Sequence, residues 1–394
     1  MADPFEETLR EWLAQRRAEH QHHERRVSES PQQPVMRVAG RRLLVFAGND
    51  YLGLANHPRV VEAVLDGVGK WGTGAGASPL VNGYCKAHQQ LEEEFAAFVG
   101  RPRALLFASD YLANLGVLSA LAAHGDQVLQ DRLNHASLVQ AGTLSGAQLH
   151  YYRHGDPQSL LGAMQQAGPG RKLVVTEGVF SLDGNFAPLA QIAAACAANE
   201  ALLAVDDAHG FGVAGETGRG TSEVQGVQPD LLVCPLDKAL GTSGALVAGS
   251  ETLIETLLQR APSYGLATPL PGALAEGARV ALRLLDSEGW RRKYVLALTE
   301  RFKAGARRLQ LPLLDSPTPI QPLAAGSNEA ARRFSEALGK AGILVPAIHP
   351  PTVDDGQASL RITLSASHTT GHVDSLLSAL ADVWEGLRDD TEPA

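Results

Sequence analysis

Short apolar runs, separated by helix-like segments, dominate the middle of the chain. Five of these runs cover residues 104–109, 172–180, 201–209, 230–236 and 244–250. Such runs, apolar along most of their length, are typical of strands buried on both faces of a parallel sheet. Segments 113–125 and 188–199 have the small and apolar residues of crossover helices. The pattern predicts an α/β domain built on a mainly parallel sheet.

The N-terminal residues have a different pattern. Residues 5–19 place Phe5, Leu9, Trp12 and Leu13 on one face of a helix, and a polar segment follows. A short strand at 42–48 then leads into the turn-forming residues of 49–54. We expect an N-terminal helical arm and one strand before the large domain begins.

The C-terminal part alternates helices with isolated strands. Amphipathic patterns predict helices at 289–309, 328–341 and 372–387, with strands at 320–326 and 359–364. The chain is therefore expected to divide into an N-terminal arm with a small-domain segment (1–55), a large α/β domain (56–288) and a smaller α+β C-terminal domain (289–394).

Composition excludes several classes of protein. A chain of 394 residues with 44% hydrophobic and 20% charged residues suits two globular domains. The net charge of −9 leaves no continuous basic face for nucleic acid. No apolar run reaches the roughly 20 residues that span a bilayer, and the first residues lack the features of a signal peptide. We expect a cytoplasmic protein without a membrane partner.

The cysteines give no sign of a disulfide or zinc framework. Cys85, Cys196 and Cys234 are odd in number and far apart in the sequence. We expect them to be thiols of the core.

Chemistry-bearing residues follow two of the predicted strands. Lys238 comes directly after the run 230–236, and Asp206 and His209 lie at the end of the run 201–209. A buried charged pair is costly unless it has partners. Pyridoxal phosphate needs a lysine amine for a Schiff base, a carboxylate at its pyridine nitrogen and a partner for its ring oxygen. Lys238, Asp206 and His209 offer these groups, although a solvated lysine and a turn-capping aspartate are the alternatives.

Two further residues have positions from which they could contact the same cofactor. His135 follows a predicted strand end and can stack on a pyridine ring, or it is a hydrogen-bonded loop histidine. Ser181 lies just past another strand and can reach the ring oxygen or the phosphate, or it caps the turn before Asp183. No cluster of ligands accompanies Asp206 and His209, so we expect no metal, and no Walker or dinucleotide fingerprint is present.

The motifs together identify a family. They are NDYLGL (49–54), HQQLE (88–92), DRLNHASL (131–138), TEGVFSLDG (176–184), VDDAHGFG (205–212), the segment around Lys238, PPTV (350–353) and SLRITLSASH (359–368). In this order, from about residue 5 to 385, they resemble the α-oxoamine synthases. The resemblance implies the fold of the pyridoxal-phosphate-dependent transferases of fold type I, which is aspartate aminotransferase-like, and a homodimer.

The resemblance also implies a reaction. It is the decarboxylative condensation of an amino acid, L-alanine, with a pimeloyl thioester on CoA or acyl carrier protein, giving 8-amino-7-oxononanoate for biotin biosynthesis. Lys238 would carry the cofactor and remove the Cα proton, Asp206 would hold the pyridine nitrogen protonated, His135 would stack on the ring and His209 would bind its oxygen. Asn49 and Thr352 match positions that contact substrate.

Several positions depart from the family pattern. At the phosphate-binding turn the chain has Asp110 beside Tyr111, and three residues before the lysine it has Pro235 in place of threonine. Asp237 replaces a small residue, while Thr268 remains as a phosphate donor. Two arginines that the family uses near substrate carboxylates align with His23 and His349, and histidine cannot form the two-pronged guanidinium bond.

Three hypotheses follow from the sequence. The first is a working acyltransferase, which the set of Lys238, Asp206, His209 and His135 favours. The second is a relative that keeps the fold but has lost or changed its activity and serves in binding or assembly, which the altered phosphate positions favour. The third is another cofactor-dependent enzyme, such as an aminotransferase or an amino-acid lyase.

Overall fold

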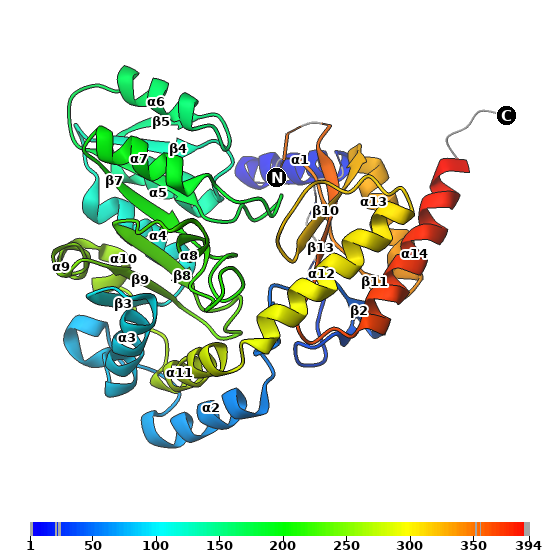
Figure 1. Ribbon diagram of the computed structural model, residues 1–394, viewed down its shortest axis with the longest axis horizontal. Coiled ribbons are helices and arrows are strands. Elements are labelled where there is room, and N and C mark those ends of the chain that lie inside the picture. The colour runs from blue at the N-terminus through cyan, green and yellow to red at the C-terminus, as the bar shows by residue number, and fades with distance from the viewer. Residues whose placement is uncertain (1–2, 20–21, 23–24, 351–352, 355, 390–394) are drawn as a thin grey trace.

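The computed structural model describes residues 3–19, 22, 25–350, 353–354 and 356–389. A large sheet covered by helices forms one part of the molecule (Figure 1). Two small sheets with three helices, among them the long helix α12 (Trp290–Arg308), form the other part. This arrangement confirms the predicted α/β fold with a mainly parallel sheet and a further α+β portion.

The large sheet has seven strands in the order β3-β9-β8-β7-β6-β4-β5. Strand β9 runs antiparallel to both of its neighbours, β3 and β8, and the other six strands share one direction. The strands are β3 (Arg103–Phe107), β4 (Gln127–Asp131), β5 (Gln148–Tyr152), β6 (Lys172–Glu177), β7 (Ala201–Asp206), β8 (Leu231–Pro235) and β9 (Ala245–Gly249).

Alternate residues of these strands point to two separate hydrophobic cores. Along β8, Leu232 and Cys234 join one core, and Leu231 and Val233 join the other. The first core also contains residues of α2 (Pro58–Trp71), α3 (Lys86–Val99), α6 (Pro157–Gln166), α7 (Leu189–Ala198) and α11 (Gly272–Ser287). The second contains residues of α4 (Asp110–Leu121), α5 (Ala136–Ser145), α9 (Glu251–Arg260) and α10 (Pro262–Gly265). Helices thus cover both faces, which explains why the central strands β8 and β9 are apolar throughout. Two short elements, the π-helix η1 (Pro79–Gly83) and α8 (Thr221–Gln225), complete this part.

The second part is built on two three-stranded sheets. One contains β1 (Val35–Val38), β2 (Arg41–Val45) and β11 (Ile343–Leu344), and the other contains β10 (Ile320–Gly326), β13 (Ala358–Thr363) and β12 (Ala347–Ile348). Met36, Val38 and Leu43 of β1 and β2 form a small cluster of their own. Together with α12, α13 (Asn328–Lys340) and α14 (Thr370–Asp389), strands β10, β11 and β13 form a third core, which includes Phe46. The segment that follows β2 therefore connects the small sheets to the large one.

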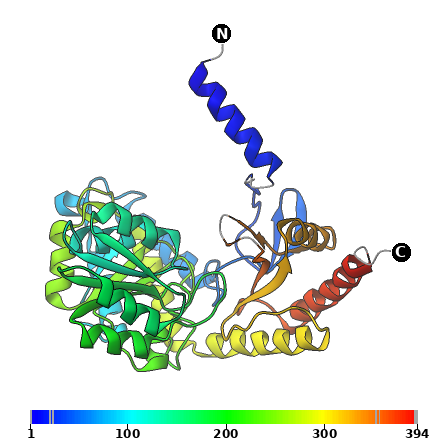
Figure 2. The ribbon, with the colours of Figure 1, turned by 90° about the horizontal axis from the view of Figure 1, so that it is seen from above.

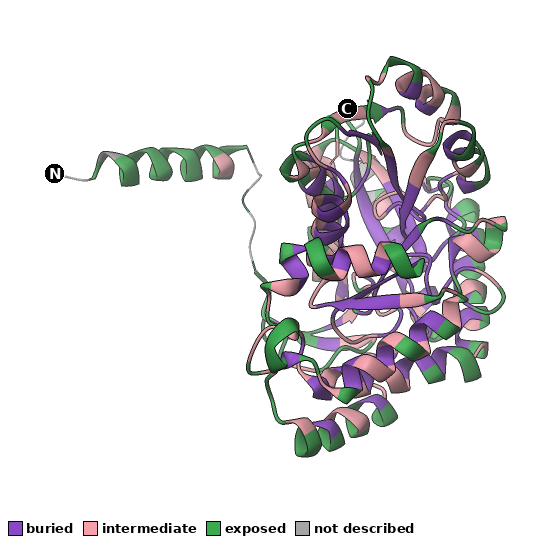
Figure 3. Cartoon of the chain, turned by 90° about the vertical axis from the view of Figure 1, so that its left-hand side faces the viewer, coloured by how far each residue is buried: buried purple, intermediate pink, exposed green. Residues whose placement is uncertain are grey.

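The N-terminal helix α1 (Pro4–Ala18) extends away from the rest of the molecule (Figures 2 and 3). The side chains of the predicted apolar face, Phe5, Leu9, Trp12 and Leu13, are exposed on it. The helical arm predicted for residues 5–19 is confirmed.

Most predicted elements agree with the structure to within a few residues, but β4 and β5 were not predicted, nor were the helices α2, α3, α5, α6, α9 and α11. All five residues of β4 are buried, although three of them are polar. Gln127 donates to the Pro169 carbonyl at 3.0 Å and Gln130 to the Leu138 carbonyl at 3.1 Å. Because these partners satisfy the buried amides, polar residues can occupy buried positions of β4. The strand therefore lacks the apolar pattern by which the other strands were predicted.

Cys196 and Cys234 are buried thiols, as predicted, while Cys85 is half-buried. Within the described ranges, no helix is long and apolar enough to cross a membrane.

The contact between α2 and α11 depends on a glycine. A Cβ at Gly67 would lie 2.7 Å from the Ala273 Cα and 3.1 Å from its carbonyl oxygen, whereas a Cβ at Gly69 on the same helix meets nothing within 4 Å. We expect Gly67→Ala to lower the free energy of unfolding by about 1–3 kcal/mol through overpacking. The matched Gly69→Ala should leave it unchanged or raise it by up to ~1 kcal/mol. Urea titration of both variants tests this, and equal stability of the two would contradict the close helix contact.

Candidate active site

The candidate site lies where three neighbouring strands end. Glu177 and Asp206, the last residues of β6 and β7, pair with each other in the parallel register, and Lys238 follows β8 by three residues. All three side chains are buried. Open α/β sheets bind their ligands at the carboxyl ends of the strands, so the position agrees with the general rule.

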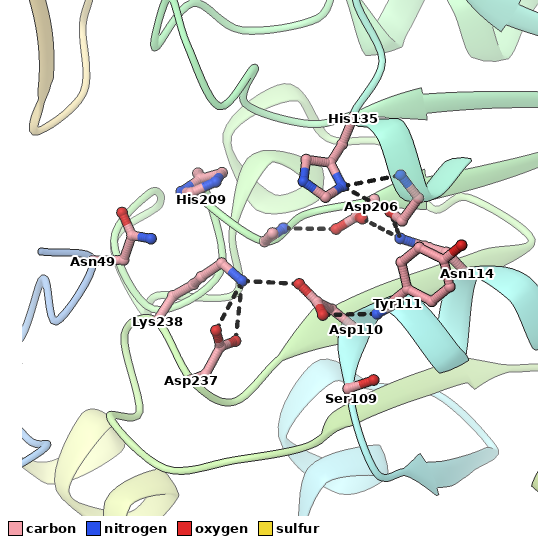
Figure 4. Close-up of polar contacts among 12 residues, drawn as sticks. Asn49, Ser109, Asp110, Tyr111, Asn114, His135, Asp206, His209, Asp237 and Lys238 are labelled. Atoms are coloured by element: carbon pink, nitrogen blue, oxygen red, sulfur yellow. Dashed lines mark hydrogen bonds and ion pairs between the residues drawn. The ribbon is translucent and has the colours of Figure 1, made fainter. Parts of the chain in front are cut away.

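Asp206 is a buried carboxylate with neutral partners. Its Oδ2 accepts a hydrogen bond from Asn114 Nδ2 at 2.7 Å, and its Oδ1 accepts one from the Ala208 N–H at 3.1 Å (Figure 4). Burial raises the pKa of Asp206, although Asn114, Lys238 and His135 partly oppose the shift. A cationic N–H placed against this carboxylate would reverse the shift, because an opposite charge favours the ionised form.

Lys238 is held by two carboxylates. Its Nζ donates to Asp110 Oδ2 at 3.1 Å and to the Asp237 oxygens at 3.0 and 3.1 Å (Figure 4). Burial alone would lower the pKa of Lys238, but Asp237 and Asp110 outweigh it and the pKa is raised. Lys238 is therefore a protonated amine in this arrangement.

His135 begins α5 on the exposed side of the site. Its Nδ1 lies 2.8 Å from Ser137 Oγ, and its backbone N–H donates to Glu177 Oε1 at 2.7 Å. The other Glu177 oxygen accepts from the Ser181 N–H at 3.1 Å. Glu177 thus ties the segments that carry His135 and Ser181 to the end of β6.

His209 follows β7 and bonds to the segment after β2. Its Nδ1 lies 2.8 Å from Tyr51 Oη. Burial, together with the charges of Arg361, Lys238 and His135, lowers the pKa of His209 well below its usual value. His209 is therefore a neutral imidazole, and its Nε2 is its second polar atom.

Arg361 brings a second cation to the site from β13. It is buried, its Nε donates to the Ser181 carbonyl at 2.6 Å and its Nη1 donates to Asn49 Oδ1 at 3.2 Å. Across the part of the chain that the structure describes, no carboxylate forms an ion pair with it. A buried guanidinium with only neutral partners is suited to bind an anionic ligand.

The structure brings together six of the predicted site residues: Asn49, Asp110, His135, Asp206, His209 and Lys238 (Figure 4). Ser181 joins them through its backbone contacts with Glu177 and Arg361. Pro235 is buried at the end of β8 and has no N–H or hydroxyl to donate. Tyr111 is exposed, and its hydroxyl bonds to Gln140.

Four other predicted positions have no contact with this group that the structure describes, or lie outside the described residues. Thr268 is exposed between α10 and α11. His349 is half-buried, with its Nδ1 2.9 Å from the Pro350 carbonyl oxygen. His23 and Thr352 lie outside the described residues.

The sequence analysis missed Tyr51, Asn114, Glu177 and Arg361. A charged residue inside an apolar strand is a signal that could have identified Glu177 and Arg361, because burying a charge requires a partner. No comparable signal marks Asn114, which contacts Asp206 across 92 positions of sequence.

Pyridoxal phosphate fits the ring end of this site. Lys238 provides an amine, Asp206 a buried acceptor for a pyridinium N–H, His209 a neutral partner for the ring oxygen, and the exposed His135 an imidazole face. The buried Asn114 Oδ1 beside Asp206 has no hydrogen-bond partner among the described residues, which also suits a polar ligand at this position. The phosphate end fits less well, since Asp110 and Asp237 add two negative charges and Pro235 provides no donor. No group of three or more potential metal ligands occurs within the described segments.

Comparisons with known proteins agree with this chemistry. The family model for aminotransferase class I and II matches residues 41–380. The 8-amino-7-oxononanoate synthase of Thioalkalivibrio sulfidiphilus is 52% identical over 97% of this chain and 98% of its own length. The 8-amino-7-oxononanoate synthase of Cellvibrio japonicus is 50% identical over 99% of this chain and 100% of its own.

A solved structure extends the similarity to three dimensions. A lysine variant of serine palmitoyltransferase from S. paucimobilis, with a bound PLP–myriocin aldimine, superposes with a TM-score of 0.92 at 25% identity, covering 98% of this chain and 99% of that one. The chain belongs to aminotransferase class I and II and, within it, to the family of the 8-amino-7-oxononanoate synthases.

Proposed function

We propose that this protein is a pyridoxal-phosphate-dependent acyltransferase that condenses L-alanine with a pimeloyl thioester, giving 8-amino-7-oxononanoate, CO2 and the free thiol carrier. The observation that carries the proposal is the convergence of Lys238, Asp206, His135 and His209 at the strand ends of a chain in this family. Identities of 52% and 50% over nearly the full length do not favour a relative with a lost or changed activity.

Asp206 is proposed to accept the N–H of the pyridine ring. When bound, the cofactor provides an electron sink for the negative charge that develops at the Cα of the amino acid. The Asn114 amide and the Ala208 N–H hold the two carboxylate oxygens, so the carboxylate keeps one orientation. Since burial disfavours its charge, Asp206 gains most from a cationic partner, and it therefore holds the ring nitrogen protonated.

Lys238 is proposed to bind the cofactor aldehyde and then to transfer the proton of the substrate. Asp110 and Asp237 favour the protonated form of the free Nζ, so Lys238 would act as the base only after losing that proton. Its neutral Nζ would then take the proton from the Cα of L-alanine, which leaves an electron pair there. That pair forms a bond to the acyl carbon while the C–S bond breaks and the thiolate leaves. Loss of the amino-acid carboxylate as CO2 and return of a proton to Cα complete the reaction.

Arg361 is proposed to bind the carboxylate of L-alanine before it is lost. The Ser181 carbonyl and Asn49 Oδ1 orient its guanidinium, which is buried without an acidic partner in the described part of the chain. We propose that Asn49, Thr352, His23 and His349 also contact substrate. The two histidines would do so at the carboxylates for which the family uses arginine.

We also propose which residues contact the cofactor. His135 would stack on the ring, His209 would bind its oxygen and Ser181 would lie beside it. The segments of Asp110, Tyr111, Pro235 and Thr268 would surround the phosphate.

We propose further that the protein acts as a homodimer in the cytoplasm and takes its acyl group from CoA or acyl carrier protein. The division into an arm with a small-domain segment (1–55), a large domain (56–288) and a small domain (289–394) is also proposed. The separate hydrophobic core that α12, α13 and α14 share with the small sheets supports it.

Turnover of Asp206→Asn tests the proposed function. With L-alanine and pimeloyl-CoA, the parent protein should release 8-amino-7-oxononanoate and CO2, which mass spectrometry detects. A neutral amide loses a charge-assisted bond of roughly 1.5–3 kcal/mol, so turnover of the variant should fall on the order of ten- to hundredfold or more.

Asp207→Asn is the matched control, because the neighbouring buried carboxylate accepts hydrogen bonds from Thr221. It should lower stability while the folded fraction keeps its turnover. No product from the parent would refute the reaction, and parental turnover in Asp206→Asn would refute the role of that residue.

Arg361→Lys tests the carboxylate contact. Lysine keeps the charge but loses the planar fork and the bonds to Ser181 and Asn49. The KM for L-alanine should rise on the order of tenfold if the contact contributes about 1.4 kcal/mol, and kcat should change less. The exposed Arg301, which pairs with Asp374, provides the control Arg301→Lys. An unchanged KM in Arg361→Lys would exclude this role.

A further inference from the structure

The N-terminus of α4 is already occupied by side chains of its own first turn. The Tyr111 N–H donates to Asp110 Oδ1 at 2.7 Å (Figure 4). The Leu112 N–H donates to Ser109 Oγ at 3.2 Å. Free N–H groups at such a position are what make a helix end bind phosphate. Here two of them have intramolecular acceptors, and one acceptor is itself an anion.

The charges next to this helix end are also unfavourable for phosphate. Asp110 from α4 and Asp237 beside Lys238 place two carboxylates around one amine. Among the described residues, the other charged or titratable groups coupled to this cluster are Asp206 from β7, His135 before α5, His209 after β7 and Tyr51, and Arg361 acts in turn on His209 and Tyr51. A phosphate dianion would add two negative charges beside these two carboxylates, and among the described residues Lys238 is the cation that pairs with them, while Arg361 donates instead to Ser181 and Asn49.

An uncharged hydroxymethyl group in place of the phosphate would not be repelled by the two carboxylates. Its hydroxyl can donate a hydrogen bond to a carboxylate of Asp110 or Asp237, which a fully ionised phosphate cannot do. Recognition of the ring by Lys238, Asp206, His135 and His209 does not depend on the 5′ group.

We propose that Asp110 and Asp237 determine the selectivity of this site at the 5′ position, so that it binds unphosphorylated pyridoxal about as well as pyridoxal phosphate. The inference rests on the proposed function, since it takes Lys238 as the residue that binds the aldehyde. The two ligands share one ring and differ only in the 5′ substituent, so the two aspartates would determine which ligand the site prefers.

The test compares two ligands in two proteins by absorbance titration. The measured quantity is the ratio of the dissociation constant for pyridoxal to that for pyridoxal phosphate. In the parent this ratio should be below about ten, and in Asp110→Asn/Asp237→Asn it should rise by roughly tenfold or more. The asparagines keep the size of the side chains and remove both charges. Any internal ring closure of free pyridoxal is the same in both titrations, so it cancels when the two ratios are compared.

Two further variants keep the result interpretable. Asp66→Asn/Asp315→Asn changes the net charge equally at exposed positions and should leave the ratio unchanged. Asp110→Gly/Asp237→Gly provides a second removal of both carboxylates if the asparagine variant does not fold. A parent that already prefers the phosphate by more than about a hundredfold, or a ratio that neither variant changes, would overturn the inference while the proposed function stands. If neither ligand binds to any of these proteins, both proposals fail.

Discussion

Two carboxylates that lie side by side inside the sheet impose the strongest constraint on this structure. Glu177 and Asp206 end neighbouring parallel strands, they pair in register, and both are buried. Burial raises the pKa of both carboxyl groups, and the charge of Asp206 raises the pKa of Glu177 further. The surrounding groups compensate through the amide of Asn114 and the backbone N–H groups of His135, Ser181 and Ala208. The segments that carry the chemistry are thus fixed by the need to satisfy these acids.

The hydrogen bonds to Glu177 also begin a continuous set of contacts between the large sheet and the small ones. Ser181 donates its N–H to Glu177 and accepts a hydrogen bond from Arg361 on β13, and Arg361 in turn donates to Asn49. Tyr51, two residues further along, bonds to His209 after β7. Groups that would bind the cofactor ring are thereby linked to the group that would bind the substrate carboxylate. A displacement of the small sheets relative to the large one would alter the substrate contact first.

The sequence alone predicted the parts of the structure that depend on local pattern. Apolar runs revealed β3, β6, β7, β8 and β9 because both faces of each strand are buried, and Lys238 and Asp206 were found because a charge at the end of such a run needs a partner. The polar strand β4 escaped prediction because its buried amides find acceptors that only the folded chain provides. The same holds for the ion pair of Lys238 with Asp110, whose partners are 128 positions apart. Contacts of this kind are set by the packing of the strands, which the order of residues does not reveal directly.

The central claim is that Lys238, among all lysines of the chain, binds the cofactor. Borohydride reduction in the presence of saturating pyridoxal phosphate, followed by proteolysis and mass spectrometry, measures this directly, since reduction converts a reversible imine into a stable amine. The account predicts a single modified peptide, labelled at Lys238 and absent when Lys238→Ala is treated in the same way. A label on another lysine, or no label at saturating cofactor, would contradict it.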